Sequence, residues 1–237
     1  LAPTIISGIN DAKHVMRTPE LFFNFNTYKQ ADMMIKSALK LVSDAYSPSI
    51  LTLSTFESGF RAEESTQRSA EFSLNRDVNP FIDLYEKVLL PSESWENYNL
   101  VGISIVGISQ ILPGLTLARL LKEKYPHLHI TLGGPIFSVN SKQLMGHPKF
   151  FQQFCDSIIT FEGEEPLHRL LTTLKNGSTL RGVPNLIFCE DGKIKSNEER
   201  VELRFEEMPP PTFDGLPMDL YLSPYPILPV LQSRGCY

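Results

Sequence analysis

The pattern of apolar and polar positions is clearest in the stretch VGISIVGISQILPGLTLARLLKEKYPHLHITLGGP, residues 101–135. Residues 100–106 form a short apolar run rich in β-branched side chains, which is typical of a strand buried on both faces of a sheet. Residues 112–125 show apolar side chains at helical spacing, and residues 127–132 form a second apolar run. A strand, a crossover helix and a second strand predict one parallel βαβ unit with a right-handed connection.

The same reasoning predicts further elements on both sides of this unit. The expected strands are residues 4–9, 50–54 and 156–161, and the expected helices are residues 27–46, 80–90 and 164–175. The polar stretch 57–77 has little periodicity and is interpreted as a long loop or lid over the ligand edge, in part helical. Asp191 and Gly192 stand between two short apolar runs and give the signal of a β-hairpin with a two-residue turn.

The alternation of strands and helices predicts an α/β fold. We expect a doubly wound, Rossmann-like or flavodoxin-like sheet of five parallel strands in the order 2-1-3-4-5, with the β-hairpin appended to it. The expected domains are residues 1–180 for the sheet with an N-terminal extension, 181–208 for the hairpin, and 209–237 for a proline-rich linker followed by the first strand of another domain.

Small and polar residues gather where three of the expected parallel strands end. They are Ser104, Gly107, Ser109 and Gln110 after the first strand, Gly133, Gly134 and Pro135 after the second, and Glu162, Gly163 and Glu164 after the third. Taken singly, each group is explained by turn chemistry, a strand end or an acidic first helical turn. Ligands bind beyond the carboxyl ends of parallel strands, so three such loops in succession predict one binding surface.

Composition and charge exclude several classes of protein. The chain has 237 residues, 42% of them hydrophobic, and a formal net charge of −5 from 22 basic and 27 acidic residues. No cluster of Lys or Arg predicts a nucleic acid or an anionic membrane as partner. No apolar run approaches the length of a membrane span, and the start of the chain has no signal-peptide pattern. Three widely spaced cysteines suit a reducing compartment, so we expect a cytoplasmic protein.

Two common ligand motifs are absent from the sequence. It contains neither GxGxxG nor GxxxxGKS/T, so nucleotide phosphates lack their usual cradle. His14 and His147 belong to no cluster with the spacing of metal ligands, and His127 and His129 fall at the start of a strand. The residues by themselves therefore predict an α/β sheet with a broad, largely uncharged ligand edge.

Residues 101–135 resemble the cobalamin-binding domain that precedes the radical SAM domain in cobalamin-dependent radical SAM enzymes. The similarity continues through FEGEEPLHRLL, GVPNLIF and MPPPTFDGLPMDLYLSP and ends at LQSRGCY. Within that family, the order of AYSP, NPF, VGIS, GGP and PNL most resembles a branch associated with the maturation of ribosomally made, modified peptides.

The resemblance implies cobalamin lying across the carboxyl edge of the sheet, above residues 104–110, 133–135 and 162–164, with its nucleotide tail between the sheet and a helix. The DxHxxG motif, which supplies a histidine to cobalt in related domains, is absent. We therefore expect cobalamin with its own base detached and no histidine on cobalt. Cys236, in SRGCY, would be the first cysteine of a 4Fe–4S cluster that binds S-adenosylmethionine in the intact enzyme.

The sequence thus favours the cobalamin-binding module of a radical SAM enzyme that modifies a ribosomally made peptide by methyl transfer to carbon. We expect no catalytic residue in this chain and no radical chemistry from it alone, because only one of three cluster cysteines is present. One alternative is a flavodoxin-like module that binds a leader peptide or a protein partner and has lost cobalamin. A signalling receiver domain is disfavoured, because the strand at residues 101–106 ends without an aspartate.

Overall fold

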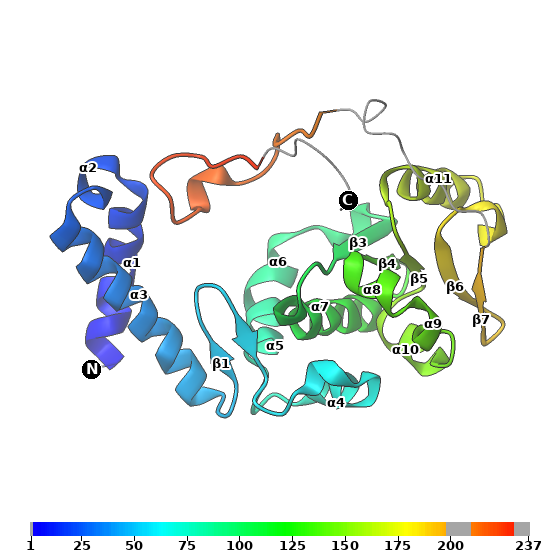
Figure 1. Cartoon of the computed structure of the whole chain (residues 1–237), viewed down its shortest axis with the longest axis horizontal. Coiled ribbons are helices and arrows are strands. Elements are labelled where there is room, and N and C mark those ends of the chain that lie inside the picture. The colour runs from blue at the N-terminus through cyan, green and yellow to red at the C-terminus, as the bar shows by residue number, and fades with distance from the viewer. Residues whose placement is uncertain (1, 198–209, 230–237) are drawn as a thin grey trace, which may run out of the picture. The chain divides into compact units, whose positions relative to one another are not determined.

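The computed structural model describes residues 2–197 and 210–229, and the chain divides into two compact units (Figure 1). The first unit comprises Leu1–Ala45, Ile50–Thr55 and Arg204–Tyr237, and the second comprises Tyr46–Ser49 and Phe56–Leu203. Cys236, the start of the proline-rich linker and the expected strand at the end of the chain lie outside the described residues. Among the described residues, no helix is both long and apolar enough to cross a membrane.

The first unit is a pair of packed helices with short additions. Its elements are α1 (Ala2–Arg17), α2 (Pro19–Phe22), α3 (Phe25–Ala45), the two-residue strand β1 (Ile50–Leu51) and the 3-10 turn η7 (Met218–Leu220). Ala12 and Met16 of α1 pack against Ala31 and Ile35 of α3, and all four are buried. The helix expected at residues 27–46 is therefore confirmed.

The strand expected at residues 4–9 is wrong, because these residues belong to α1. Ile5, Ala12 and Met16 are buried, and their spacing places them on one side of a helix. A window of six residues is too short to show this spacing, so its β-branched side chains favour a strand when they are considered alone. The strand expected at residues 50–54 shrinks to β1 and is not part of the main sheet.

The second unit contains a five-stranded sheet in which sequence order and spatial order agree. The strands are β3 (Leu100–Ser104), β4 (His129–Gly133), β5 (Ser157–Ile159), β6 (Leu186–Glu190) and β7 (Lys193–Ser196). β3, β4 and β5 are parallel, with Gly102 opposite Thr131 and Ser104 opposite Gly133. β6 is antiparallel to both of its neighbours.

The α/β class is confirmed, but the parallel five-stranded sheet with order 2-1-3-4-5 is not. The hairpin expected as an appendage supplies two of the five strands. Asp191 and Gly192 have φ angles of 52° and 72°, which close a tight turn and force β6 and β7 to run antiparallel. The backbone N–H of Thr160 donates to the carbonyl oxygen of Asn185 at 2.9 Å, so β6 begins beside the end of β5.

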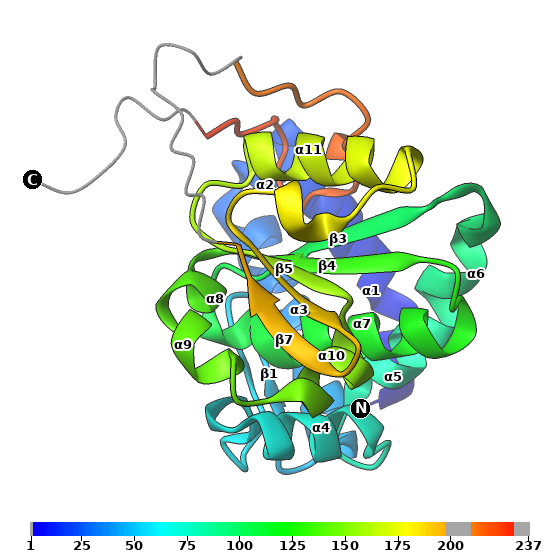
Figure 2. The same ribbon diagram turned by 90° about the vertical axis from the view of Figure 1, so that its right-hand side faces the viewer.

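Helices cover both faces of this sheet (Figure 2). α7 (Ile111–Lys124) and α10 (Pro148–Phe154) lie on one face, where the larger apolar core includes Ile105, Ile130 and Leu132. α11 (Glu164–Lys175) lies on the other face, where Leu170 packs with residues of β5 and β6 in a smaller core. We call these the α7 face and the α11 face.

Most of the remaining elements surround the α7 side of the second unit, and the last of them lies beside α11. They are β2 (Phe56–Glu57), η1 (Ala62–Glu64), α4 (Thr66–Leu74), α5 (Pro80–Leu84), the π-helix η2 (Tyr85–Leu89), α6 (Leu90–Ser92), η3 (Trp95–Asn97), η4 (Ile108–Gln110), α8 (Pro135–Val139), α9 (Ser141–Leu144) and η5 (Leu180–Gly182). The stretch 57–77 is thus partly helical. The buried guanidinium of Arg119 on α7 donates to the carbonyl oxygen of Ser73 at 2.8 and 3.1 Å, which holds the end of α4 against α7.

Candidate functional site

The loops after β3, β4 and β5 meet at one edge of the sheet, because these strands are adjacent and parallel. The backbone N–H of Ile105 donates to the carbonyl oxygen of Gly133 at 2.8 Å, which joins the first two loops. The backbone N–H of Phe161 donates to the Ser138 hydroxyl at 2.7 Å, which joins the third loop to α8. The three groups of residues singled out in the sequence therefore lie side by side.

Gln110 shapes the first loop with its side chain. Its Oε1 accepts hydrogen bonds from the backbone N–H groups of Val106 and Gly107, at 2.8 and 3.1 Å. This oxygen closes the turn that leads into α7, which is a capping role. Ser109 is half-buried in the same turn. A Cβ at Gly107 would meet nothing within 4 Å, so the surface above this loop is open.

The second loop shows that its two glycines have different roles. Gly134 has φ of +114°, and a Cβ there would lie 2.8 Å from the carbonyl carbon of Ile105 and still closer to its oxygen. Gly134 is therefore required by the close approach of two backbones. A Cβ at Gly133 would lie 3.8 Å from the carbonyl oxygen of Ile159, which is an ordinary contact. Pro135 begins α8 at a position that tolerates proline.

The third loop contains the acidic residues of the edge. Glu162 lies before the helix, and its carbonyl oxygen accepts from Nδ2 of Asn185 at 3.2 Å. Glu164 is the first residue of α11, and its carboxylate accepts from the backbone N–H of Gly163 at 3.1 Å. An acidic side chain in the first turn of a helix is favoured by the helix dipole. These two residues thus have structural roles at the start of α11.

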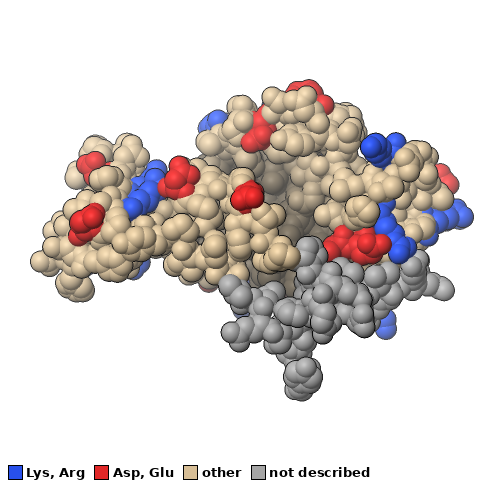
Figure 3. All heavy atoms as spheres, turned by 90° about the horizontal axis from the view of Figure 1, so that it is seen from above, with Lys and Arg blue, Asp and Glu red and all other residues tan. Residues whose placement is uncertain are grey.

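Four large apolar side chains are exposed around this edge, and sequence reasoning missed them. Val106 and Ile108 follow β3, Val139 ends α8, and Phe161 follows β5, with exposed fractions of 61, 68, 82 and 49%. The only charged residues in the three loops are Glu162 and Glu164. On the face seen in Figure 3, most of the drawn surface is uncharged. Exposed apolar side chains that gather in this way are typical of binding surfaces.

A second feature of the site lies on the α11 face of β3 and β4. Gly102 and Ser104 alternate along β3 on this face, and both are exposed. A Cβ at Gly102 would meet only a methyl group of Thr131, at 3.7 Å. The part of the α11 face that lies over β3 is therefore an open strip of small residues. In the sequence, the small residues at every second position of VGIS are the pattern that indicates this strip.

Polar groups on β4 and β5 continue this strip under α11. His129 lies 2.8 Å from Ser157 Oγ through its Nε2, and the Ser157 hydroxyl donates to Thr131 Oγ1 at 3.0 Å. Because Ser157 donates to Thr131, its oxygen accepts from the Nε2–H of His129. Burial lowers the pKa of His129 below its ordinary value, while the Asp156 carboxylate acts in the opposite direction. Burial therefore favours the neutral imidazole.

A cavity of about 880 Å³ opens where the strip reaches the amino ends of β3 and β4. Its lining includes Leu100, His127, His129, Asp156, Leu171 and Leu174. Leu171 and Leu174 come from α11, so the cavity lies between the sheet and this helix. Its volume falls within the range of roughly 300–1,000 Å³ that is typical of small-molecule sites.

Metal-binding groups do not gather in the described part of the chain. Within residues 2–197 and 210–229, no group of at least three His, Cys, Asp or Glu side chains is placed to hold a metal ion. Burial raises the pKa of the Cys155 thiol well above its ordinary value, so this cysteine is an inert core residue. Cys236, the expected cluster cysteine, lies outside the described residues.

Comparison with known proteins finds a similarity to a protein that is named as a methyltransferase. No protein-family model matches the chain. The chain is 29% identical over 143 residues to an uncharacterized methyltransferase, PH0819, of Pyrococcus horikoshii. The match covers 58% of this chain and 29% of that protein. The chain therefore shares a region with a larger protein that is named as a methyltransferase.

Proposed function

We propose that this chain is the cobalamin-binding part of an enzyme that transfers a methyl group to carbon in a ribosomally made peptide. The observation that carries the proposal is the open, uncharged strip on the α11 face, which joins the apolar carboxyl edge to a cavity of about 880 Å³. The similarity to a protein named as a methyltransferase supports the reaction class. The sequence resemblance described above suggests the cofactor and the radical SAM setting.

The residues present fit a large, planar, uncharged ligand at the carboxyl edge. Gly107 has open space where a side chain would stand, and a Cβ at Gly133 would meet only the carbonyl oxygen of Ile159, at 3.8 Å. The exposed apolar side chains Val106, Ile108 and Phe161 supply contact area for a ring of this size. Ser104, Ser109, Gly133, Pro135, Glu162, Gly163 and Glu164 complete the surface, while Gln110 holds the first loop in shape.

The nucleotide tail of the cofactor would occupy the open strip and the cavity. Ser104, Gly102 and Leu100 follow one another at every second position of β3, so they form one line that leads from the carboxyl edge to the cavity. Leu171 and Leu174 of α11 offer apolar contacts to a flat base, and the neutral His129 offers its second ring nitrogen as a hydrogen-bond acceptor.

Cobalamin, when bound, supplies the methyl group and carries the chemical step. The chain would orient it and exclude water from its lower face. None of the three loops at the edge contains a histidine, so we propose that cobalt takes no imidazole from this domain. Reduction and activation of S-adenosylmethionine would require a 4Fe–4S cluster, of which Cys236 would be the first cysteine by the sequence resemblance.

Titration of the whole chain with hydroxocobalamin tests the proposal, with binding followed by visible absorption and by thermal stability. Gly102→Val is the decisive variant. Its Cβ would meet only a methyl group of Thr131, at ordinary contact distance, and its own methyl groups would add bulk to the open strip. We expect wild-type binding without the spectrum of imidazole coordination, and at least about tenfold weaker binding by Gly102→Val with unchanged folding.

Gly182→Val is the matched control, because Gly182 lies in η5 and a Cβ there would also meet nothing within 4 Å. It should bind hydroxocobalamin as the wild type does. Absence of both spectral change and stabilisation in the wild type would reject the cofactor and favour the alternative of a protein-interaction or leader-peptide module. Equal binding by wild type and Gly102→Val would reject the position assigned to the nucleotide tail.

A further inference from the structure

A second cavity, of about 430 Å³, lies beside the carboxyl edge on the side of α7. One wall is the segment from Glu63 to Ser69, which includes the start of α4. The opposite wall comes from α8, α9 and the start of α10. Nothing in the cofactor proposal uses this cavity, and its volume suits a large side chain or a short segment of peptide.

The floor of this cavity is apolar. Leu115, Phe137, Leu144 and Phe150 line it and are buried, with exposed fractions between 2 and 6%. Ile111 and Ile136 complete the floor and are half-buried. Binding of an apolar side chain on such a floor is favourable, because apolar surface of both the side chain and the floor is removed from water.

The rim carries hydrogen-bond acceptors and negative charge. Glu63 accepts from the Ser58 hydroxyl through one carboxylate oxygen, at 3.0 Å. Glu64 pairs with Arg61 at 3.3 Å, but both side chains are exposed and such pairs are weak. On the opposite wall, Nδ2 of Asn140 donates to the carbonyl oxygen of Ile136 at 2.8 Å, which leaves its Oδ1 as an acceptor.

The cavity also adjoins the proposed cofactor surface. Ile111 follows Gln110 directly, and Ile136 follows Pro135, so two floor residues are next to two loops of the carboxyl edge. A peptide anchored in the cavity would have its neighbouring residues at that edge. A free small molecule would gain nothing from this adjacency.

We propose that this cavity anchors the peptide substrate, with one large apolar side chain on the floor and an adjacent Lys or Arg at Glu63 and Glu64. That the occupant is a peptide rests on the proposed function. The new element is which side chains of the peptide are held, and by which residues. The negative charge of the rim is the reason for a basic residue in the peptide, because opposite charges attract. The apolar floor is the reason for a large apolar side chain next to it.

The probe is a fluorescein-labelled pentapeptide amide with phenylalanine followed by lysine at its centre, and binding to the whole chain is followed by fluorescence anisotropy. The wild type should bind it, and the same peptide with glutamate in place of lysine should bind at least about tenfold more weakly. The double variant Glu63→Gln with Glu64→Gln should lose this preference for lysine.

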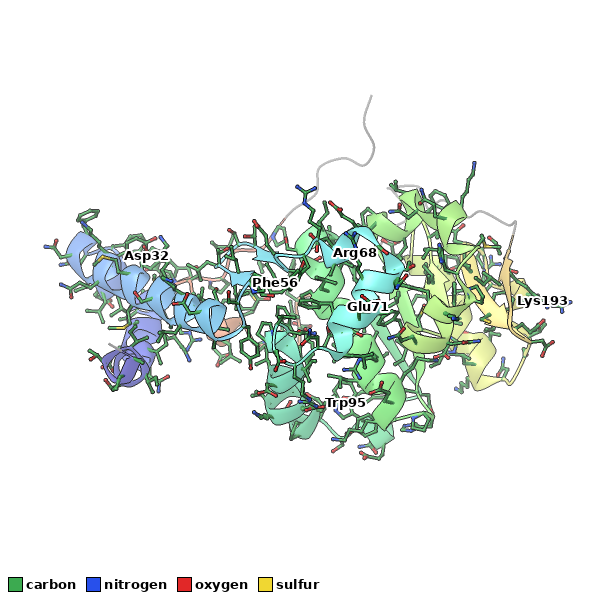
Figure 4. The ribbon with its side chains drawn as sticks, turned by 90° about the horizontal axis from the view of Figure 1, so that it is seen from below. Asp32, Phe56, Arg68, Glu71, Trp95 and Lys193 are labelled. Carbon is green, nitrogen blue, oxygen red and sulfur yellow. The ribbon has the colours of Figure 1, made fainter. Side chains whose placement is uncertain are left out.

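Thr66→Trp places a large ring in the cavity from the half-buried first residue of α4 and should abolish binding of the probe. Gln67→Trp is the matched control, because Gln67 is the next residue, is exposed and does not line the cavity. Arg68 and Glu71, labelled in Figure 4, line a separate cavity of about 420 Å³, and Arg68→Gln should leave the probe bound. Equal binding by the Thr66→Trp and Gln67→Trp variants would overturn the proposal.

Hydroxocobalamin titration of the same variants separates the two proposals. Thr66→Trp should bind hydroxocobalamin as the wild type does. Cobalamin binding without any peptide binding would reject this inference alone. Peptide binding that depends on Thr66 and the two glutamates, without cobalamin binding, would reject the cofactor and leave the peptide site standing.

Discussion

The two faces of β3 and β4 differ sharply, although alternate residues of the same strands build both. On the α7 face, Ile130 and Leu132 of β4 are completely buried in the larger core, and the half-buried Val101 and Ile103 of β3 pack against it. On the α11 face, Gly102 and Ser104 are small and exposed. Period-two alternation thus lets one short strand serve a packed core and an open strip at once. Stability and ligand binding should therefore respond to different substitutions on the same strands.

The same contrast appears between two glycines at the carboxyl edge. Gly134 lies against the backbone of Ile105 in a conformation that side chains rarely adopt. Gly107 is extended, with φ of −120°, and has nothing within 4 Å of a Cβ. One glycine is fixed by packing and the other leaves space over the edge, although both look alike in the sequence.

The largest expected effect is the loss of packing on the α7 face. Leu132→Ala removes a completely buried side chain and should lower the free energy of unfolding by about 2–5 kcal/mol. Ser104→Ala, on the α11 face, should change it by less than about 0.5 kcal/mol. Urea unfolding followed by circular dichroism measures both values. Similar losses for the two variants would show that the faces do not differ in packing.

Gly134→Ala should have the next largest effect. The added Cβ cannot avoid the backbone of Ile105, so we expect a loss of roughly 1–3 kcal/mol in the free energy of unfolding. Gly107→Ala should leave stability unchanged or raise it by up to about 1 kcal/mol, because alanine accepts an extended backbone. Thermal and urea unfolding of the pair provide the comparison. If Gly134→Ala were as stable as Gly107→Ala, the backbone of Ile105 would not exclude a side chain at position 134, and our explanation of this glycine would be wrong.

Local patterns predict the elements between residues 100 and 135 well. The expected helix at residues 112–125 is α7 (Ile111–Lys124), because fourteen residues of helical spacing leave little ambiguity. Asn79 is expected to begin a helix, and its side chain does accept from the backbone N–H of Phe81 at 3.0 Å. The order of strands cannot be predicted in this way, because which strands become neighbours depends on contacts between distant segments.

The sequence predicts which loops form the candidate site, but it predicts less well what the individual side chains in those loops do. Parallel strands must end together, so the three loops follow from their order alone. Gln110 is expected at the ligand edge, which stays a prediction, and the turn that its oxygen closes at Val106 and Gly107 has no signal in the sequence. The exposure of Ile108 and the open space over Gly102 arise from packing around them, which no local pattern contains.

The smallest expected effect comes from the polar groups on the α11 face. Burial lowers the pKa of His129 in the folded chain, and the opposing influence of Asp156, itself paired with Lys122, limits the shift. In the unfolded chain the imidazole takes up a proton near pH 6.5. Below that pH the unfolded state binds more protons than the folded state, so this contribution to stability falls as the pH falls.

His129→Gln tests this sign, because glutamine keeps a donor for Ser157 and cannot titrate. The free energy of unfolding should be measured for both proteins by urea between about pH 7.5 and 5. The wild-type value minus the variant value should be constant above about pH 7 and should decrease as the pH falls below about 6.5. Titrating groups that do not interact with His129 contribute equally to both proteins and cancel. A difference that increases toward low pH would mean that His129 is charged in the folded chain, and its second ring nitrogen would then be a donor and not the acceptor proposed above.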